Sequence, residues 1–326
     1  MTQTMKAARI HEYGKSGILR VETCERPTPG PDELLIKVKT ASLNPRDWLT
    51  MRGIYQMRRV VEPFPITLGS DFAGEVAEIG SNVTGFAAGE LVCAMQPLRG
   101  KFGAFAEYVK VKACVCAKLL EGTSTVDAAA MPCAGMTSYQ TLHDIAKVQP
   151  GEVVLVNGAS GGVGVYAVQI AKAMGAKVIA VCGPNNIEFC KELGADDVIN
   201  YREDDFAMRE NAYDVVYDVI GRSSPKAVKK ALKPGGRYIT TIPGIGTSMA
   251  ALGSYLLGFI WPFKRKTTHL ILVKPHPHDL QAMMQLILDG KLKTIVDGHY
   301  ALDDIEQAVA RSQTWRARGK IIIDIS

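Results

Sequence analysis

The alternation of apolar and polar positions changes character about a third of the way along the chain. Over residues 1–125, short apolar stretches such as 34–39 are separated by turn residues, and residues 69–89 alternate apolar stretches with Gly and Asn. From residue 126 onward, apolar strand patterns alternate with helical patterns, which is typical of βαβ units and a parallel sheet. The pattern therefore predicts an antiparallel, barrel-like β domain followed by an α/β domain.

The α/β region contains successive strand patterns with helical stretches between them. Right-handed crossovers join such units into a doubly wound parallel sheet. We predict strands at 152–157, 177–182, 195–200, 213–218, 237–242 and 269–273, and helices at 163–174, at 187–193 and over a stretch ending at Leu232.

The C-terminal part adds an amphipathic stretch, 279–289, and an apolar strand, 320–324. We expect these elements to return to the first domain. The predicted domains are 1–125, 126–267 and the returning segment 268–326.

Length and composition narrow the class of protein. A chain of 326 residues corresponds to roughly two domains of about 150 residues. Apolar residues make up 47% and charged residues 22%, which excludes intrinsic disorder, collagen and coiled coil. Because 38 basic and 33 acidic residues leave a dispersed net charge of only +5, a dedicated nucleic-acid binder is not expected.

Cysteine usage and the N-terminal residues bear on the compartment. Seven cysteines form an odd set without a C-x-x-C pair, which indicates reduced thiols. The first residues lack the basic and apolar regions of a secretion signal. We expect a cytoplasmic protein.

The most apolar run, residues 249–263, is interrupted by Gly253, Gly258 and Pro262 and ends in the basic residues 264–266. It is shorter than the roughly 20 residues that a membrane span requires. Two interpretations remain open: a lid or dimer-contact segment, which we favour, or a segment in weak contact with an anionic membrane surface.

A glycine-rich turn is the strongest local signal for function. Residues 156–164 read VNGASGGVG and lie between a predicted strand and a predicted helix. In that position glycines let the backbone approach a dinucleotide pyrophosphate, and the helix N-terminus supplies N–H donors. The alternative is a turn needed only for packing. We predict cofactor contacts from Ser160, Gly161, Gly162, Val163 and Gly164, and from Val219 and Ile242 at the nicotinamide end.

The end of the second strand bears on the choice of cofactor. An acidic side chain there binds the ribose 2′-OH of NAD(H) and repels a 2′-phosphate. Residues 182–186 contain no acid, so NADP(H) is favoured over NAD(H). The residues expected around a 2′-phosphate are Cys182, Asn185, Asn186, Tyr201 and Arg202.

Together with the glycine turn, four further motifs resemble the medium-chain dehydrogenase/reductase superfamily and its zinc-independent quinone oxidoreductase branch. They are LNPRD at 43–47, GSDFAGEV at 69–76, MPCAGMT at 131–137 and RGK at 318–320. The resemblance covers nearly the whole chain. It implies a GroES-like β-barrel-type domain, a Rossmann domain and a homodimer. It also places Asn44 and Tyr55 in the nicotinamide and substrate pocket and Thr137 beside the nicotinamide, while Lys320 matches a family position or is only a surface charge.

Zinc separates the branches of this superfamily. The pattern of the zinc enzymes has Cys where this chain has Asn44, and Gly-His-Glu where it has Gly69, Ser70 and Asp71. Cys133 lies near the third ligand position, but one thiol cannot hold a catalytic zinc. The cysteine cluster of the structural zinc is also missing, since residues 90–112 contain only Cys93. We expect no metal.

Without a Lewis acid, reduction of an electron-poor quinone or an α,β-unsaturated carbonyl is more plausible than alcohol oxidation. Tyr55 is then a candidate donor to the substrate oxygen. Alternatives remain open for both residues: Tyr55 as a half-buried surface aromatic, and Asn44 as a turn residue before Pro45. The rival functions are a zinc-free alcohol or aldehyde dehydrogenase and a non-catalytic nucleotide-binding protein.

Overall fold

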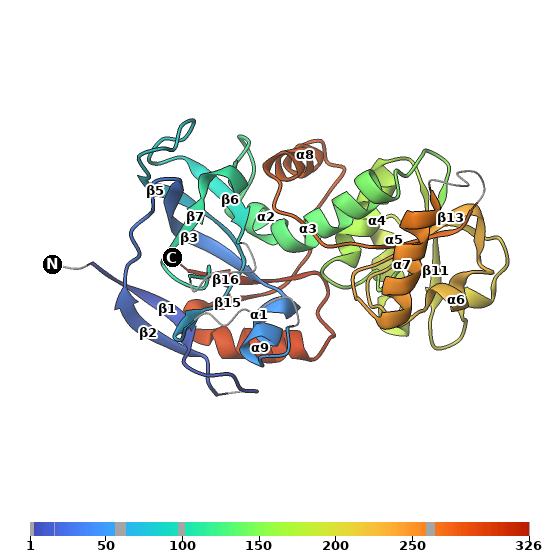
Figure 1. Cartoon of the computed structure of the whole chain (residues 1–326), viewed down its shortest axis with the longest axis horizontal. Helices are drawn as coiled ribbons and strands as arrows, with labels where there is room; N and C mark the ends of the chain where they lie inside the picture. Colours follow the sequence, from blue (N-terminus) through green and yellow to red (C-terminus); the bar gives the residue numbers. More distant parts are fainter. Residues whose placement is uncertain (1–2, 16, 56–62, 97–101, 259–264, 326) are drawn as a thin grey trace. The chain divides into compact units, whose positions relative to one another are not determined.

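The computed structural model describes residues 3–15, 17–55, 63–96, 102–258 and 265–325. The chain divides into two compact units (Figure 1). The first contains residues 1–136, 274–288 and 294–326, and the second contains residues 137–273 and 289–293. The first division therefore falls inside helix α3 (Pro132–Tyr139), further along the chain than the predicted boundary at 126.

The first unit is built mainly from β-strands. Its strands are β1 (Thr4–Ile10), β2 (Arg20–Glu25), β3 (Glu33–Leu43), β4 (Ile66–Thr67), β5 (Asp71–Ile79), β6 (Leu91–Met95), β7 (Tyr108–Lys112), β8 (Ala117–Lys118), β15 (Val296–Ala301) and β16 (Lys320–Asp324). A large sheet has the order β15-β16-β3-β5-β6-β8, with β7 paired to β3, and a small sheet has the order β2-β1-β4. All these pairs are antiparallel except β15 with β16, which is parallel. The antiparallel pairing agrees with the predicted β domain.

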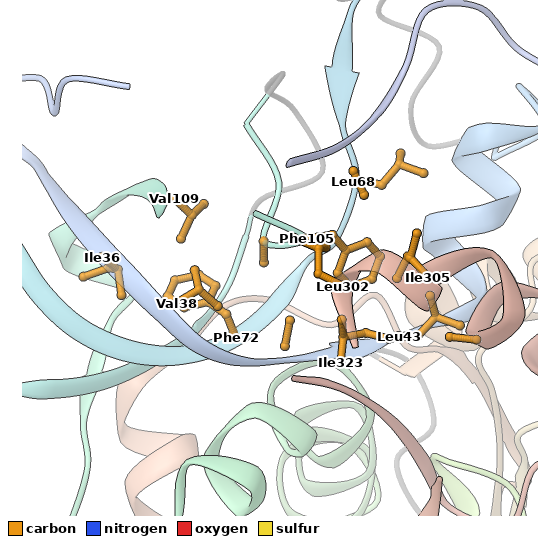
Figure 2. Close-up of a cluster of buried hydrophobic side chains, with 14 of the residues drawn as sticks. Ile36, Val38, Leu43, Leu68, Phe72, Phe105, Val109, Leu302, Ile305 and Ile323 are labelled. Carbon is orange, nitrogen blue, oxygen red and sulfur yellow. The ribbon is translucent and has the colours of Figure 1, made fainter. Parts of the chain in front are cut away.

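A hydrophobic core joins the N-terminal and C-terminal parts of this unit. Figure 2 shows Phe72 and Phe105 beside Leu302, Ile305 and Ile323, all of which are buried. Removing such side chains from water contributes about 1.5–3 kcal/mol each. Because β16 pairs with β3 and carries Ile323, the last strand of the chain belongs to the first unit's sheet.

The helices of the first unit are α1 (Pro45–Met51), α2 (Thr125–Ala130), α8 (Pro277–Leu288), α9 (Ile305–Gln313) and the first part of α3. Helix α1 begins directly after β3, where Asn44 and Asp47 form a reciprocal capping box. Its Trp48 indole N–H donates to Ser312 Oγ on α9 at 3.1 Å, so the two helices lie side by side (Figure 1).

The second unit is a parallel sheet with helices. Its elements are β9 (Val153–Asn157), α4 (Gly164–Ala173), β10 (Lys177–Cys182), α5 (Ile187–Glu192), β11 (Asp197–Asn200), β12 (Tyr213–Asp218), α6 (Pro225–Val228), β13 (Leu232–Thr240), α7 (Ile245–Gly258) and β14 (Thr267–Leu270). The strand order is β11-β10-β9-β12-β13-β14, and every neighbouring pair is parallel. This is the strand order of the Rossmann fold, so the predicted fold class is confirmed.

The predicted helix ending at Leu232 was wrong, because α6 stops at Val228. Leu232 pairs with Tyr213 as the first residue of β13. Pro234 follows, which has no N–H to donate, and Gly235 has a φ of +81°. Neither residue suits a helix interior, whereas the buried side chain of Leu232 suits the sheet. The predicted strand 269–273 lies further toward the N-terminus, since β14 begins at Thr267 and ends at Leu270.

Among the residues that the structure describes, no helix combines the length and the apolar character needed to cross a bilayer. The predicted apolar segment 249–263 begins within α7, and its residues 259–263, like Lys264, lie outside the described part of the chain.

Candidate active site

The parallel strands of the second unit bring the predicted cofactor residues to one edge of the sheet. Asp218 is in register with Asn157 on one side and with Thr240 on the other, and Cys182 is in register with Asn200. The segments that follow these strands therefore start at the same edge. They carry Ser160, Gly161, Gly162, Val163, Gly164, Cys182, Asn185, Asn186, Tyr201, Arg202, Val219 and Ile242.

The glycine turn after β9 requires glycine at both of its ends. Gly158 has a φ of +90°, and a Cβ there would lie 2.6 Å from Ile220 Cγ1. A Cβ on Gly164 would lie 2.1 Å from the carbonyl oxygen of Gly158. Ser160 Oγ accepts a hydrogen bond of 3.0 Å from Asn186 Nδ2, which links the turn to the end of β10. The turn thus leads directly into α4, whose N-terminus suits a pyrophosphate.

Asp218 holds the neighbouring loop, and the sequence analysis missed it. Its Oδ1 accepts from Asn157 Nδ2 at 2.8 Å and from the Gly221 N–H at 2.9 Å. Its Oδ2 accepts from the Ser223 N–H at 2.9 Å and from the Tyr238 hydroxyl at 3.0 Å. A buried carboxylate with four donors fixes the backbone from Val219 onward. The available signal was an Asp at the carboxyl end of a predicted strand, directly after the apolar residues 215–217.

The end of β10 carries no carboxylate. Tyr201 lies against Gly183, since a Cβ on Gly183 would be 3.4 Å from the tyrosine ring. The tyrosine is 56% exposed, and Arg202 beside it is also exposed. Cys182, in contrast, is buried, and a hydrogen bond with Cys190 of α5 lowers the pKa of its thiol. Its side chain is therefore directed into the protein and only its backbone is at this edge.

Thr137 lies on the helix that contacts the glycine turn. The neighbouring Ser138 hydroxyl donates to the carbonyl oxygen of Val163 at 2.8 Å. Thr137 itself is buried, and its carbonyl oxygen accepts from Thr141 Oγ1 at 2.7 Å. The second half of α3 is thus fixed against the start of α4.

The first unit contains a buried polar cluster around Asn44. The Asn44 amide Nδ2 donates to Asp71 Oδ2 at 2.9 Å and to Ser70 Oγ at 3.3 Å, while its Oδ1 accepts from Lys320 Nζ at 2.6 Å. The Asp71 carboxylate also accepts from Ser70 Oγ at 3.0 Å and from the Cys133 N–H at 2.8 Å. Lys320 is only 2% exposed, so it is not a surface charge.

Burial shapes the protonation of this cluster. Desolvation raises the pKa of Asp47 to about 7, although the Arg46 charge and the N–H of Asn44, 2.8 Å from Asp47 Oδ2, oppose the shift. Desolvation likewise raises the pKa of the Cys133 thiol to about 11, so the thiol is protonated at neutral pH. The pKa of the Asp47 carboxyl therefore lies near neutrality.

Tyr55 lies at the edge of this cluster. It is half-buried, and burial raises the pKa of its hydroxyl, with the Arg46 charge opposing. Its backbone N–H donates to the Leu49 carbonyl at 3.2 Å, so its position depends on α1. The hydroxyl is protonated at neutral pH, so it has a hydrogen available to donate.

Comparisons with known proteins place the chain among oxidoreductases. Residues 30–121 match the alcohol dehydrogenase GroES-like domain, and residues 193–323 match a family described as zinc-binding dehydrogenase. The chain is 34% identical over 98% of its length to the chloroplast envelope quinone oxidoreductase homolog of Arabidopsis thaliana, of which 98% is covered. It is 32% identical over 98% of its length to 2-methylene-furan-3-one reductase of Solanum lycopersicum, of which 79% is covered.

The fold agrees with these sequence matches. The quinone oxidoreductase of Coxiella burnetii superposes with a TM-score of 0.88 at 30% identity, covering 99% of this chain and 100% of that one.

The zinc implied by one family description does not fit the residues present. A catalytic zinc takes His, thiolate and carboxylate ligands. Here the corresponding positions hold an amide and a hydroxyl that are hydrogen-bonded within the cluster, and Cys133 supplies only a single thiol. Among the described residues, no three His, Cys, Asp or Glu side chains are grouped to hold a metal ion.

Two domain matches, whole-chain identities of 30% and above, and the Rossmann strand order agree with one another. The chain belongs to the medium-chain dehydrogenase/reductase superfamily of oxidoreductases, in company with the quinone oxidoreductases.

Proposed function

We propose that this protein is a zinc-independent, NADPH-dependent reductase of quinones or α,β-unsaturated carbonyl compounds. One combination of observations carries the proposal: a dinucleotide-binding edge in one unit, and a buried polar cluster without metal-ligand chemistry in the other. The Arabidopsis relative is named a quinone oxidoreductase and the tomato relative a reductase of a methylene-furanone. A quinone and a methylene-furanone are both electron-poor acceptors, which can accept hydride from a nicotinamide cofactor.

The end of β10 supports NADP(H) over NAD(H). No carboxylate follows Cys182 before Asn186, so nothing there repels a 2′-phosphate. The exposed guanidinium of Arg202 and the exposed ring of Tyr201 lie after β11, next to that position. Arg202 supplies charge, and Tyr201, Asn185 and Asn186 supply hydrogen-bonding groups for a phosphate.

The protein's own residues bind and orient the reactants. We call the sheet edge that carries the glycine turn at 156–164 the glycine edge. A nicotinamide bound there would supply the hydride. Ser160 to Gly164 hold the pyrophosphate through backbone N–H groups, and Val219 and Ile242 give the nicotinamide end an apolar surface. Tyr55, protonated at neutral pH, donates a hydrogen bond to the oxygen on which negative charge develops. Asn44 acts by positioning, because its amide is already bonded to protein groups.

Turnover with a panel of acceptors tests this function. Chelator-treated protein is assayed for oxidation of NADPH, with NADH in parallel, against a quinone, an alkenal, an aldehyde and no acceptor. We expect chelation-resistant reduction of the quinone or the alkenal with preference for NADPH. Activity on the aldehyde alone would instead support the zinc-free alcohol dehydrogenase alternative. Cofactor binding without turnover would support a non-catalytic nucleotide-binding protein.

The surface of α7 supports a homodimer. Strand β14 ends the sheet order, and Ser254 Oγ on α7 accepts from the Thr268 N–H on that strand at 2.9 Å. Helix α7 carries no charged residue, and it exposes Ile245, Met249, Leu252 and Tyr255. An edge strand beside an exposed apolar helix suits pairing with a second copy. Light scattering of the purified protein should give twice the chain mass.

A membrane surface is the competing occupant of this face. Flotation with anionic liposomes at low salt distinguishes a membrane surface from a second copy of the chain. If the face only contacts a second copy, the protein should not float with the liposomes.

We also propose a reducing compartment, the cytoplasm. The seven cysteines form an odd set without a C-x-x-C pair, which is typical of reduced thiols. Fractionation of cells producing the tagged native chain tests this assignment.

A further inference from the structure

A lysine in the interior of the first unit has no role in the function proposed so far. Lys320, the first residue of β16, is 2% exposed. Its ammonium donates to Asn44 Oδ1 at 2.6 Å and to the Leu43 carbonyl at 3.3 Å, and it lies 3.9 Å from Asp71 Oδ2. A buried ammonium is strongly unfavourable unless it is paired and hydrogen-bonded. Here its donors are directed to protein oxygens, so Lys320 does not contact the substrate.

The ammonium connects segments that are distant in the sequence. Asn44 ends the stretch from β3 and caps α1, whereas Asp71 begins β5. Asp71 in turn accepts from the Cys133 N–H in the first turn of α3. The bonds from Lys320 and Asp71 therefore join the starts of two helices to the sheet.

The lysine also decides how the Asn44 amide is oriented. A cation next to Oδ1 requires the carbonyl end of the amide to face it, so Nδ2 faces Asp71 and Ser70. In the same residue the backbone N–H donates to Asp47, which completes the N-terminal cap of α1. Any rotation of this amide would disturb the start of the helix.

Helix α1 leads to the candidate donor. The N–H groups of Ile54 and Tyr55 both donate to the Leu49 carbonyl, at 3.1 and 3.2 Å. The position of Tyr55 thus depends on α1, and Asn44 is the N-cap of α1.

We propose that Lys320 is a positioning residue of the reductase, whose ammonium orients the Asn44 amide and balances the Asp71 carboxylate so that α1 holds Tyr55 in place. This inference rests on the proposed function. In the absence of metal-ligand chemistry, an internal cation organises this site.

A double-mutant cycle in kcat tests the route through Asn44. We expect Lys320→Met to lower kcat for the quinone about 50-fold, because small displacements of catalytic groups have effects of this size. The NADPH dissociation constant stays within about twofold of wild type, since the glycine edge is unchanged. The double variant Lys320→Met with Asn44→Ala should have a kcat no lower than that of the less active single variant. A loss equal to the product of the two single losses would overturn the proposal.

A matched substitution controls for loss of a lysine. Lys6 forms an exposed ion pair with Asp303 at 3.2 Å in the same unit. Lys6→Met should leave kcat unchanged, because exposed pairs contribute little. An equal loss of kcat in Lys6→Met and Lys320→Met would contradict a specific role of Lys320.

Thermal unfolding keeps the inference testable if Lys320→Met folds poorly or the wild type shows no turnover. Lys320→Met should lower Tm by about 10 °C, because it leaves Asp71 buried without its cation. Adding Asp71→Asn should restore at least half of that loss, while kcat stays low. If the Tm losses of Lys320→Met and Asp71→Asn simply added in the double variant, the pairing of Lys320 with Asp71 would be refuted. If the wild type were inactive but the two substitutions still showed non-additive effects on Tm, only the proposed function would be refuted.

Discussion

The glycine edge of the second unit and the polar cluster of the first unit are the two parts of the proposed site, and they differ in what they are made of. The edge is formed mainly by backbone atoms, and Gly158 and Gly164 have space for no Cβ atom. The cluster consists of side chains that satisfy one another, with Asn44, Asp71 and Lys320 drawn from separate strands and turns. The first arrangement is local in sequence and the second is not.

This difference shows how each region should respond to mutation. A backbone cradle tolerates no added atoms, and its failure removes the ligand. A side-chain cluster fails by leaving a buried charge or donor unpaired, so its variants show coupling and pH dependence.

The largest expected effect is on the glycine edge. Gly164→Val would place branched carbons against the Gly158 carbonyl, which lies 2.1 Å from the position of the first added atom. We expect NADPH binding, measured by quenching of protein fluorescence, to weaken at least 100-fold. Gly246→Ala in α7 is the control, since a Cβ there meets nothing within 4 Å and binding should be unchanged. Binding of wild-type strength in Gly164→Val would contradict the placement of the pyrophosphate.

The sequence was informative where function depends on local pattern. The turn at 156–164 and the apolar strands around it predicted the parallel sheet, because period and glycine spacing are local properties. The family motifs also marked Asn44 and the replaced zinc positions.

Long-range side-chain contacts were not predictable in the same way. Lys320 follows a glycine near the C-terminus, and no local pattern shows that its ammonium reaches Asn44, 276 positions earlier. Two of the four bonds of Asp218 likewise depend on strand pairing: the bond from Asn157 requires β12 to pair with β9, and the bond from Tyr238 requires β12 to pair with β13. The wrong prediction of a helix ending at Leu232 has the same origin. Leu232 pairs with Tyr213 as the first residue of β13, and this tertiary pairing outweighs local helical propensity.

The next effect concerns the pH dependence of stability around α1. Burial raises the pKa of Asp47 to about 7, with Arg46 and Lys320 opposing and Asp71 adding to the shift. The folded state thus holds this proton where the unfolded state has released it. The stabilisation is complete below about pH 4 and is lost as pH rises to about 7, on the order of 4 kcal/mol in all, because the pKa is raised from 3.8 to about 7.

Asp47→Asn removes that pH dependence while keeping an acceptor for the Asn44 N–H. In urea unfolding, the variant should gain stability relative to wild type as pH rises from 4 to 7. Asp303→Asn, at an exposed site, should show a difference from wild type that does not vary with pH. A constant difference for Asp47→Asn as well would show that the carboxyl is ionised in the folded protein throughout this range.

The role of Tyr55 predicts a smaller effect, on turnover alone. Tyr55→Phe removes the hydroxyl but keeps the half-buried ring, so Tm should be unchanged. We expect kcat for the quinone to fall about 30-fold, the effect of losing one hydrogen bond to a developing negative charge. Tyr13→Phe is the matched control, a partly exposed tyrosine of the same unit whose ring makes an edge-to-face contact with Phe64. Equal kcat values in the two variants would mean that Tyr55 is only a surface aromatic.

The smallest effect concerns cofactor choice at the end of β10. Arg202 is exposed, so its contact with a 2′-phosphate is screened by water and contributes modestly. Arg202→Ala should raise KM for NADPH about tenfold and leave KM for NADH unchanged, because only the phosphate distinguishes the two cofactors. Arg209→Ala removes a nearby cation that is bound to Asp204 at 2.9 Å, and it should change neither value. If KM rose equally for NADPH and NADH in Arg202→Ala, the arginine would stabilise the loop after β11 and would not bind the 2′-phosphate.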